Sequence, residues 1–344
     1  MNRKSSKTTL TDIAVKLGIT ESTVSKALRG ETDVSADTAA KIRAAAAEMG
    51  YDDSRLNSRI RGVPTVGVVF AELNSEYYHG MYESFRRRLT DEGWRVVTMV
   101  TDLNDAGAIV ESVEFLIRKR VGGLFVLAEV DVDLSGIRRL IEKTGTPAVF
   151  VSNMTDVDFC DSVNINHAIG VRLPLSAFYD LGHERIAFVG DRYTGMRERL
   201  FRRTVGDRTG SPVPEELVAV SDERASEGGY ISACRLLDLP EKIRPTAILA
   251  AYDDLAYGVY RAAAERGLSI PDDLSVASID DNQASACINP GLTSVTVPVK
   301  EIGARAAELI LARAAGDASP FNTLLLTPKL VERGSIAAPK GLKR

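Results

Sequence analysis

The stretch TDIAVKLGITESTVSKAL, residues 11–28, contains two short segments with helical spacing that meet at one glycine. The first segment, residues 12–17, has three apolar residues on one face, Ile13, Ala14 and Leu17. Gly18 can end this helix, because glycine adopts a positive φ without steric cost. The sequence therefore predicts a short helix followed by a tight turn.

The second segment begins at Thr20, a good N-cap, and runs over residues 21–28. Its apolar stripe consists of Val24, Ala27 and Leu28. The pattern predicts a helix-turn-helix unit, whose second helix typically enters the major groove of DNA. The outward positions are short, polar or basic, as groove-facing residues should be: Glu21, Ser22, Thr23, Ser25, Lys26 and Arg29. A plain helical hairpin with a solvated face remains an alternative to this interpretation.

A third helix is expected from residue 36 to a stop at Gly50, with Ser35 as its N-cap. Its buried stripe consists of Ile42, Ala45, Ala46 and Met49. The polar segment over residues 53–61 follows, and a solvated linker is one interpretation of it. A strand, TVGVVF, then starts after Pro64.

Charge is unevenly distributed along the 344 residues, which have a formal net charge of −4. Residues 1–62 contain 11 Lys or Arg and 8 Asp or Glu, a net charge of +3, so only this head suits a polyanion. No apolar run approaches the roughly 18 residues of a membrane span, and no apolar run follows the basic N-terminus as in a secretory signal. The three scattered cysteines favour a reducing compartment, so we expect a cytoplasmic protein without a membrane partner.

From residue 64 onward, apolar strand-like runs alternate with helical stretches in two sets of similar length. Such alternation predicts an α/β fold with doubly wound parallel sheets in two lobes. Ligands of these sheets bind outside the carboxyl ends of the strands. The sequence therefore predicts a ligand cleft between the lobes.

The run TTLTDIAVKLGITESTVSKALRGETDVSADTAAKIRAAAAEMGY closely resembles the head of LacI/GalR-type transcriptional repressors. The segments LGHERIAFVGD and NPGLTSVTVPVKEIGARAAELIL resemble that family's periplasmic-binding-protein-like body. The resemblance implies a helix-turn-helix domain over 1–51, a hinge over 52–63 and a ligand-binding and dimerisation domain over 64–338. It also implies an N-lobe of about 64–161 plus 296–322, and a C-lobe of about 162–295 plus 323–338.

The resemblance further implies a set of DNA-contacting residues in the head. They are Thr9, Leu10, Thr11, Thr20, Glu21, Ser22, Thr23, Ser25, Lys26, Arg29 and Val34. In the hinge it implies backbone contact by Arg55, a neighbouring Asn57 where alanine is common, and Ile60 as the residue inserted into the minor groove. Isoleucine replaces the usual leucine and is stiffer because it is β-branched.

The cleft residues implied by the resemblance are Asn74, Tyr77, Tyr78, Ser152, Arg197, Asp253 and Asp280. Guanidinium forks and carboxylates satisfy vicinal hydroxyls, and aromatic rings cover the apolar face of a sugar. Each residue also has a structural alternative: the tyrosines could be ordinary packing, and Asp280 could only anchor a strand end. Ser152 and Asp253 stand where Asp and Asn are usual, so the sequence leaves open which sugar binds.

The implied function is that of a ligand-responsive repressor of carbohydrate-related genes. It would bind a palindromic double-stranded operator as a homodimer, with a sugar or sugar derivative as effector. No H-x-x-x-H pattern, phosphate loop or nucleophile elbow is present in the sequence, so we expect neither an enzyme nor a cofactor or metal. The alternatives are a sugar-receptor-like protein without operator function and an α/β enzyme with an incidental head.

Overall fold

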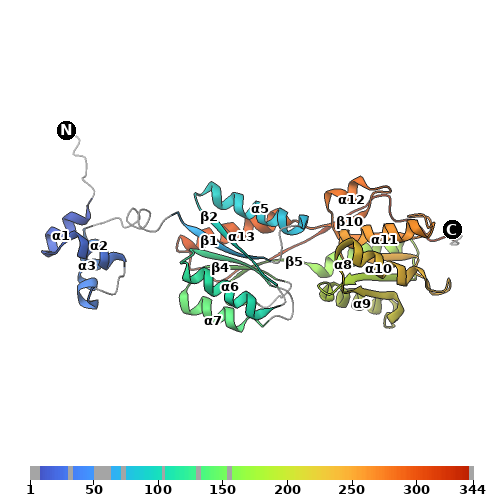
Figure 1. Cartoon of the computed structure of the whole chain (residues 1–344), viewed down its shortest axis with the longest axis horizontal. Helices are drawn as coiled ribbons and strands as arrows, with labels where there is room; N and C mark the ends of the chain where they lie inside the picture. The colour runs from blue at the N-terminus through green and yellow to red at the C-terminus, as the bar shows by residue number, and fades with distance from the viewer. Residues whose placement is uncertain are drawn as a thin grey trace. The chain divides into compact units, whose positions relative to one another are not determined.

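The computed structural model describes residues 8–29, 34–49, 63–70, 75–102, 105–128, 133–152 and 157–340 (Figure 1). The chain forms two compact units, a head (Met1–Pro64) and a body (Thr65–Arg344). None of the described helices combines the length and hydrophobicity that crossing a membrane requires.

Three helices form the head: α1 (Leu10–Leu17), α2 (Glu21–Arg29) and α3 (Ala36–Glu48). Thr9 and Asp12 make a reciprocal capping box at the start of α1, and Gly18 ends α1 with φ 65°. Thr20 Oγ1 accepts the backbone N–H of Thr23 at 3.1 Å, which confirms the predicted cap of α2. The helices thus begin and end at residues whose side chains or backbone freedom suit those positions.

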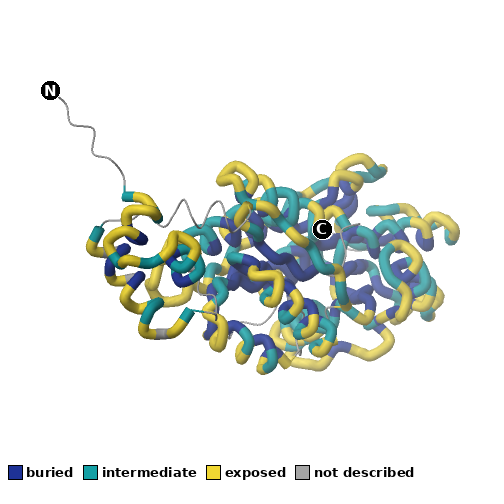
Figure 2. Tube along the Cα trace, turned by 60° about the vertical axis from the view of Figure 1, so that its left-hand side comes forward, coloured by how far each residue is buried: buried dark blue, intermediate teal, exposed yellow. Residues whose placement is uncertain are grey.

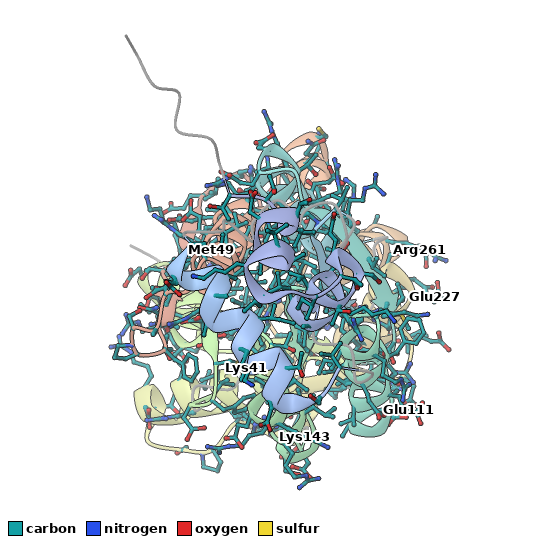
Figure 3. All side chains as sticks on the ribbon, turned by 90° about the vertical axis from the view of Figure 1, so that its left-hand side faces the viewer. Lys41, Met49, Glu111, Lys143, Glu227 and Arg261 are labelled. Carbon is teal, nitrogen blue, oxygen red and sulfur yellow. The ribbon has the colours of Figure 1, made fainter. Side chains whose placement is uncertain are left out.

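The head has its own core, in which each helix contributes a fully buried residue: Ile13, Val24 and Ile42. Small alanines, among them Ala14 and Ala45, fill the space between the helices. Met49 packs against this core from the end of α3, while Lys41 on the same helix is exposed (Figure 3). The predicted apolar stripes are therefore confirmed.

The first sheet of the body has the strand order β11-β5-β4-β3-β1-β2, and all its paired strands are parallel. Its strands are β1 (Thr65–Phe70), β2 (Arg95–Val100), β3 (Gly123–Ala128), β4 (Ala148–Ser152), β5 (Asp161–Ile165) and β11 (Thr323–Leu326). Its helices are α5 (Glu76–Asp91), α6 (Ala106–Arg118), α7 (Ser135–Thr144) and α13 (Val299–Ala314). In Figure 1, α5 and α13 cover one face and α6 and α7 the other. We call this layered unit the N-lobe.

The second sheet has the order β12-β10-β9-β8-β6-β7, parallel except for the antiparallel edge strand β12. Its strands are β6 (Ile186–Asp191), β7 (Val218–Ser221), β8 (Ala247–Ala250), β9 (Ser275–Asp280), β10 (Thr293–Thr296) and β12 (Lys329–Val331). Its helices are α8 (His167–Asp180), α9 (Gly195–Thr209), α10 (Ala225–Leu237), α11 (Asp253–Glu265) and α12 (Gln283–Cys287), with a 3₁₀ turn at Glu215–Leu217. We call this unit the C-lobe.

The predicted lobe boundaries are wrong by one strand at two of the points where the chain passes between the lobes. We assigned residues 162–165 and 323–326 to the C-lobe, but β5 and β11 pair with each other and β5 pairs with β4 in the N-lobe sheet. The sequence DSVNI does not look like a buried strand, because three of its five residues are polar, although all five are buried in β5. Asp161 is fully buried and forms an ion pair of 2.7 Å with Arg313 of α13, which compensates its charge within the N-lobe.

The buried residues follow the inner strands of both sheets, and many exposed residues lie on the helices (Figure 2). In the C-lobe, α10 and α11 pack closely because glycines face each other. A Cβ at Gly258 would lie 2.1 Å from the Ser226 carbonyl oxygen, so only glycine fits there. This close packing fixes the two helices whose first residues reach the ligand pocket.

Candidate functional site

The head presents the predicted DNA-contacting residues on its surface. Thr9, Thr11, Thr20, Glu21 and Ser22 are exposed. Those with partial exposure are Leu10, Thr23, Ser25, Lys26 and Val34. The side chain of Arg29 lies outside the described residues, as do Arg55, Asn57 and Ile60 of the predicted hinge.

Polar contacts at the start of α2 order several of these side chains. Thr11 Oγ1 donates to Glu21 Oε2 at 3.1 Å, which links α1 to the first residue of α2. The hydroxyls of Thr20 and Thr23 lie 2.8 Å apart. A helix whose exposed N-terminal turn carries hydroxyls in fixed positions can contact phosphates and base edges.

The body contains a cavity of about 310 Å³ between its two lobes. From the N-lobe it is lined by residues at the start of α5: Ser75, Tyr77 and Tyr78. From the C-lobe it is lined by His167, Tyr193, Thr194, Met196, Arg197, Arg224, Ala225, Tyr252, Asp254 and Asp280. These C-lobe residues follow β5, β6, β7, β8 and β9, so the cavity lies at the carboxyl ends of parallel strands, where ligands of such sheets bind.

Arg197 and Asp280 form the most buried charged pair of the pocket. Arg197 Nη2 lies 3.3 Å from Asp280 Oδ1, and Arg197 Nη1 donates to the carbonyl oxygen of Ala251 at 2.5 Å. Burial raises the pKa of Asp280 to about 7, although the Arg197 guanidinium acts in the opposite direction. The pair offers a planar donor and a carboxylate acceptor to one ligand.

A second charged group is organised around Asp191 at the end of β6. The Tyr252 hydroxyl donates to Asp191 Oδ2 at 2.6 Å, and Arg224 Nε lies 3.7 Å from the same oxygen. The Arg224 guanidinium also stacks over the Tyr193 ring at 4.7 Å. Tyr252, Arg224 and Tyr193 are therefore held in place on the pocket wall by a buried carboxylate.

Asp253 does not line the pocket, contrary to our expectation. It is fully buried, and its carboxylate accepts hydrogen bonds from the hydroxyls of Ser278, Ser285 and Ser294 at 2.5–2.6 Å. The backbone N–H of Asn282 is a fourth donor, at 2.6 Å. The residue before it, Tyr252, and the residue after it, Asp254, reach the pocket instead.

The donors to Asp253 come from β9, α12, β10 and the turn between β9 and α12. Asp280, the last residue of β9, and Asp281, the first of this turn, adopt positive φ values of 124° and 59°, which are unfavourable for non-glycine residues. Ser294, itself bonded to Asp253, accepts the N–H of Asp281 at 3.1 Å, and Arg333 holds the Asp281 carboxylate at 2.6 Å. Asp253 thus stabilises the turn that presents Asp280 to the pocket.

Two further pocket residues have pKa values shifted by burial. Burial raises the pKa of Asp254, and the neighbouring charges of Asp253 and Glu76 raise it further. Burial lowers the pKa of His167 to about 3, with Arg197 acting in the same direction, so this imidazole is neutral at pH 7. A neutral imidazole can donate a hydrogen bond to one hydroxyl group through its N–H and accept a hydrogen bond from another through its second nitrogen.

The structure brings together Tyr77, Tyr78, Arg197 and Asp280 of the predicted cleft residues. Asn74 and the side chain of Ser152 lie outside the described residues. Sequence reasoning missed His167, Tyr193, Thr194, Arg224 and Tyr252 as pocket residues, and it left Asp254 open between capping its helix and contacting the ligand. Several of them directly follow a buried strand, and this position was the signal that could have identified them.

Within the described parts of the chain, no three His, Cys, Asp or Glu side chains are grouped so that they could hold a metal ion. The polar groups of the pocket are instead arranged as pairs of donors and acceptors. Such pairs suit a ligand rich in hydroxyl groups.

Comparisons with known proteins agree with this division of the chain. Residues 9–54 match the family model described as bacterial regulatory proteins, lacI family. Residues 175–336 match the model of a periplasmic binding protein-like domain. The first match covers the three helices of the head, and the second covers most of the C-lobe.

Similarity to individual proteins extends over nearly the whole chain. The HTH-type transcriptional regulator MalR of Streptomyces coelicolor is 30% identical, over 97% of this chain and 98% of that protein. The lactose operon repressor of Escherichia coli is 28% identical, over 96% and 91% respectively. The crystal structure of the lac repressor dimer bound to operator and the anti-inducer ONPF superposes with a TM-score of 0.71 and 27% identity, over 97% of this chain and 100% of that one.

Proposed function

This chain belongs to the lacI family of bacterial regulatory proteins and is a DNA-binding transcriptional regulator; from this premise we propose that it represses sugar-related genes as a homodimer. Its operator affinity depends on a small molecule held in the body pocket. The observation that carries the proposal is the presence in one chain of the capped helix-turn-helix head and of a pocket with paired guanidinium and carboxylate groups.

In this proposal, α2 of the head is the recognition helix. Ser22, Ser25 and Lys26 face base edges in the major groove, and the hydroxyls of Thr20 and Thr23 approach phosphates. Ile60 enters the minor groove at the centre of the operator. A two-fold symmetric dimer reads two half-sites, so the operator is an approximate palindrome.

The pocket is the effector site. Arg197, Asp280 and Asp254 bond ligand hydroxyls from the C-lobe, while Tyr77 and Tyr78 cover the ligand from the N-lobe. A sugar operon is the regulated target of the similar lactose operon repressor, which supports a sugar here. Because ligand and operator are bound by one molecule, each changes the affinity for the other by the same factor.

Selection of duplex DNA from a random pool, by the purified chain at near-physiological salt, tests the proposal. We expect enrichment of a short palindrome with two half-sites. Lys26→Ala should reduce affinity for the selected operator about tenfold, because it removes a groove contact worth roughly 1–3 kcal/mol. Lys41→Ala, a matched change on the exposed side of α3, should bind as the wild type does.

Two results would contradict the proposal. One is the absence of any sequence enriched above the background of the pool. The other is equal operator affinity of Lys26→Ala and the wild type, which would remove α2 from the DNA interface.

A further inference from the structure

The guanidinium of Arg197 already has a counter-ion inside the pocket. Arg197 Nη2 lies 3.3 Å from Asp280 Oδ1, and both side chains are about a tenth exposed, at 12% and 10%. Water therefore screens these charges only weakly, and the ionised carboxylate of Asp280 balances the Arg197 guanidinium. An anion brought to Arg197 would have to compete with Asp280 for it.

The guanidinium of Arg224 has a counter-ion as well. Its Nε atom lies 3.7 Å from Asp191 Oδ2, and the Asp191 side chain is fully buried. Hydrogen bonds from the Tyr252 hydroxyl, at 2.6 Å, and from the Tyr193 backbone N–H, at 2.9 Å, hold Asp191 in place. Arg192 stacks over the Tyr193 ring at 4.8 Å, is exposed, and does not line the pocket.

Asp254 adds a further carboxylate to the same wall. Burial raises the pKa of Asp254, the charges of Asp253 and Glu76 raise it further, and Arg224 acts in the opposite direction, so its surroundings on balance disfavour negative charge. Among the described residues that line the pocket, no lysine is present. The C-lobe wall thus offers two paired cations and one more carboxylate.

In the sequence, the stretches that follow four N-lobe strands contain acidic residues and no basic ones. The stretches 71–75, 101–105, 129–134 and 153–158 follow the parallel strands β1, β2, β3 and β4. Each contains at least one Asp or Glu, and none contains Lys or Arg. The sequence therefore supplies no cation from these segments that could balance an anionic ligand.

We propose that the effector carries no phosphate or carboxylate group and is an uncharged or amine-bearing sugar or polyol. This inference rests on the proposed function, because it concerns the effector site of the regulator. A hydroxyl group donates and accepts at once, so it can bridge Arg197 and Asp280 without breaking their pair. A buried anion would instead lie beside Asp254 without a cation of its own, which is strongly unfavourable.

The test sorts possible effectors by charge and does not need their identity beforehand. A small-molecule extract of the cells that encode this chain is separated at pH 7 into three pools. One pool is retained by an anion exchanger, one by a cation exchanger, and one by neither. Each pool is added to the full-length chain bound to its selected operator, and operator affinity is measured.

Two variants show whether an active pool acts through the pocket. Arg197→Ala should abolish the response to the active pool. Glu227→Gln changes an exposed carboxylate of α10 that pairs only at 3.6 Å with Arg261 (Figure 3), and it should respond as the wild type does.

We expect an at least tenfold change in operator affinity with the unretained pool or with the pool from the cation exchanger. A response to the anion-exchanger pool alone, lost in Arg197→Ala, would overturn the inference and leave the proposed regulator intact. If no pool changes operator affinity, the effector role of the pocket fails, and the inference fails with it. Loss of operator binding itself would already have been detected in the DNA selection.

Discussion

The two lobes of the body have sheets of the same design but contribute differently to the pocket. Each has six strands, and the parallel strands that precede the pocket-lining residues have their carboxyl ends at the cavity, whereas β12 is antiparallel. The C-lobe supplies the charged groups, among them Arg197, Arg224 and Asp280, and each is held by a partner within the same lobe. The N-lobe, in its described part, supplies Ser75 and two tyrosines.

This difference indicates that the C-lobe recognises the polar groups of the ligand, whereas the N-lobe covers the ligand with aromatic rings. The polar wall of the C-lobe is organised before a ligand arrives, which lowers the cost of binding. The tyrosines of the N-lobe pack edge-to-face, with Tyr77 on Tyr78 at 5.1 Å and Tyr78 on Phe70 at 6.1 Å. Glu76, at the start of the same helix, accepts the Gln283 N–H of the C-lobe at 3.1 Å, so the tyrosines lie beside a contact between the lobes.

The largest effect is expected from Asp253→Asn in the C-lobe. The amide keeps the shape but cannot accept all four hydrogen bonds, so at least one buried donor loses its partner. The free energy of unfolding should fall by about 3 kcal/mol. Denaturant unfolding measures this, and ligand response should decrease because the turn at Asp280 loosens.

Asp254→Asn is the matched control for that change. The residue is adjacent in sequence but faces the pocket, and its surroundings disfavour its negative charge. The free energy of unfolding of the Asp254→Asn variant should differ from that of the wild type by less than about 1 kcal/mol. Equal destabilisation by both variants would contradict the structural role that separates the two aspartates.

Much of this architecture could be predicted from the sequence, because the relevant signals are local. The caps at Thr20 and Ser35 and the apolar stripes of the head depend on residues a few positions apart. The role of Asp253 could not be predicted from local signals, because its hydrogen-bond donors lie up to 41 residues away in the sequence. The pairing of β5 with β11 joins segments about 160 residues apart and was likewise invisible in local patterning.

The next largest effect concerns the pH dependence of the C-lobe pair. Asp280 has a pKa of about 7 in the folded chain, above the roughly 3.9 of an unfolded aspartate. The folded chain therefore binds this proton more tightly, and its stability declines as the pH rises from about 4 to about 7. Between pH 5 and pH 8 the wild type should lose about 2–3 kcal/mol more unfolding free energy than Asp280→Asn.

Denaturant unfolding of both proteins at the two pH values gives this difference directly. Parallel pH profiles for the wild type and Asp280→Asn would show that the Asp280 carboxyl group titrates normally. The pocket would then be more hydrated than the buried Arg197–Asp280 pair implies.

Arg197→Ala should weaken ligand binding by about 30-fold, because it removes a charged hydrogen-bond donor worth roughly 2 kcal/mol. Operator binding without ligand should persist. Arg203→Ala, an exposed change on the same helix, is the control and should bind ligand normally. Titration calorimetry with the active pool compound measures both, and unchanged affinity in Arg197→Ala would remove this residue from the site.

The smallest effect is expected on the N-lobe side. Tyr77→Ala removes a covering ring and should weaken ligand binding about fivefold, equivalent to roughly 1 kcal/mol. Tyr82→Ala removes another ring that packs on Phe70, at 6.1 Å, but does not line the pocket, so it should leave ligand affinity unchanged. If Tyr77→Ala weakened binding more than Arg197→Ala, the division of tasks between the lobes would be wrong.

Operator affinity of the full-length chain, measured with and without the compound that binds the pocket, tests the central claim most directly. We predict an at least tenfold difference between the two affinities in the wild type and a much smaller difference in Arg197→Ala at the same compound concentration. Identical affinities in the wild type, with the compound shown by calorimetry to be bound, would contradict the claim that the pocket controls DNA binding.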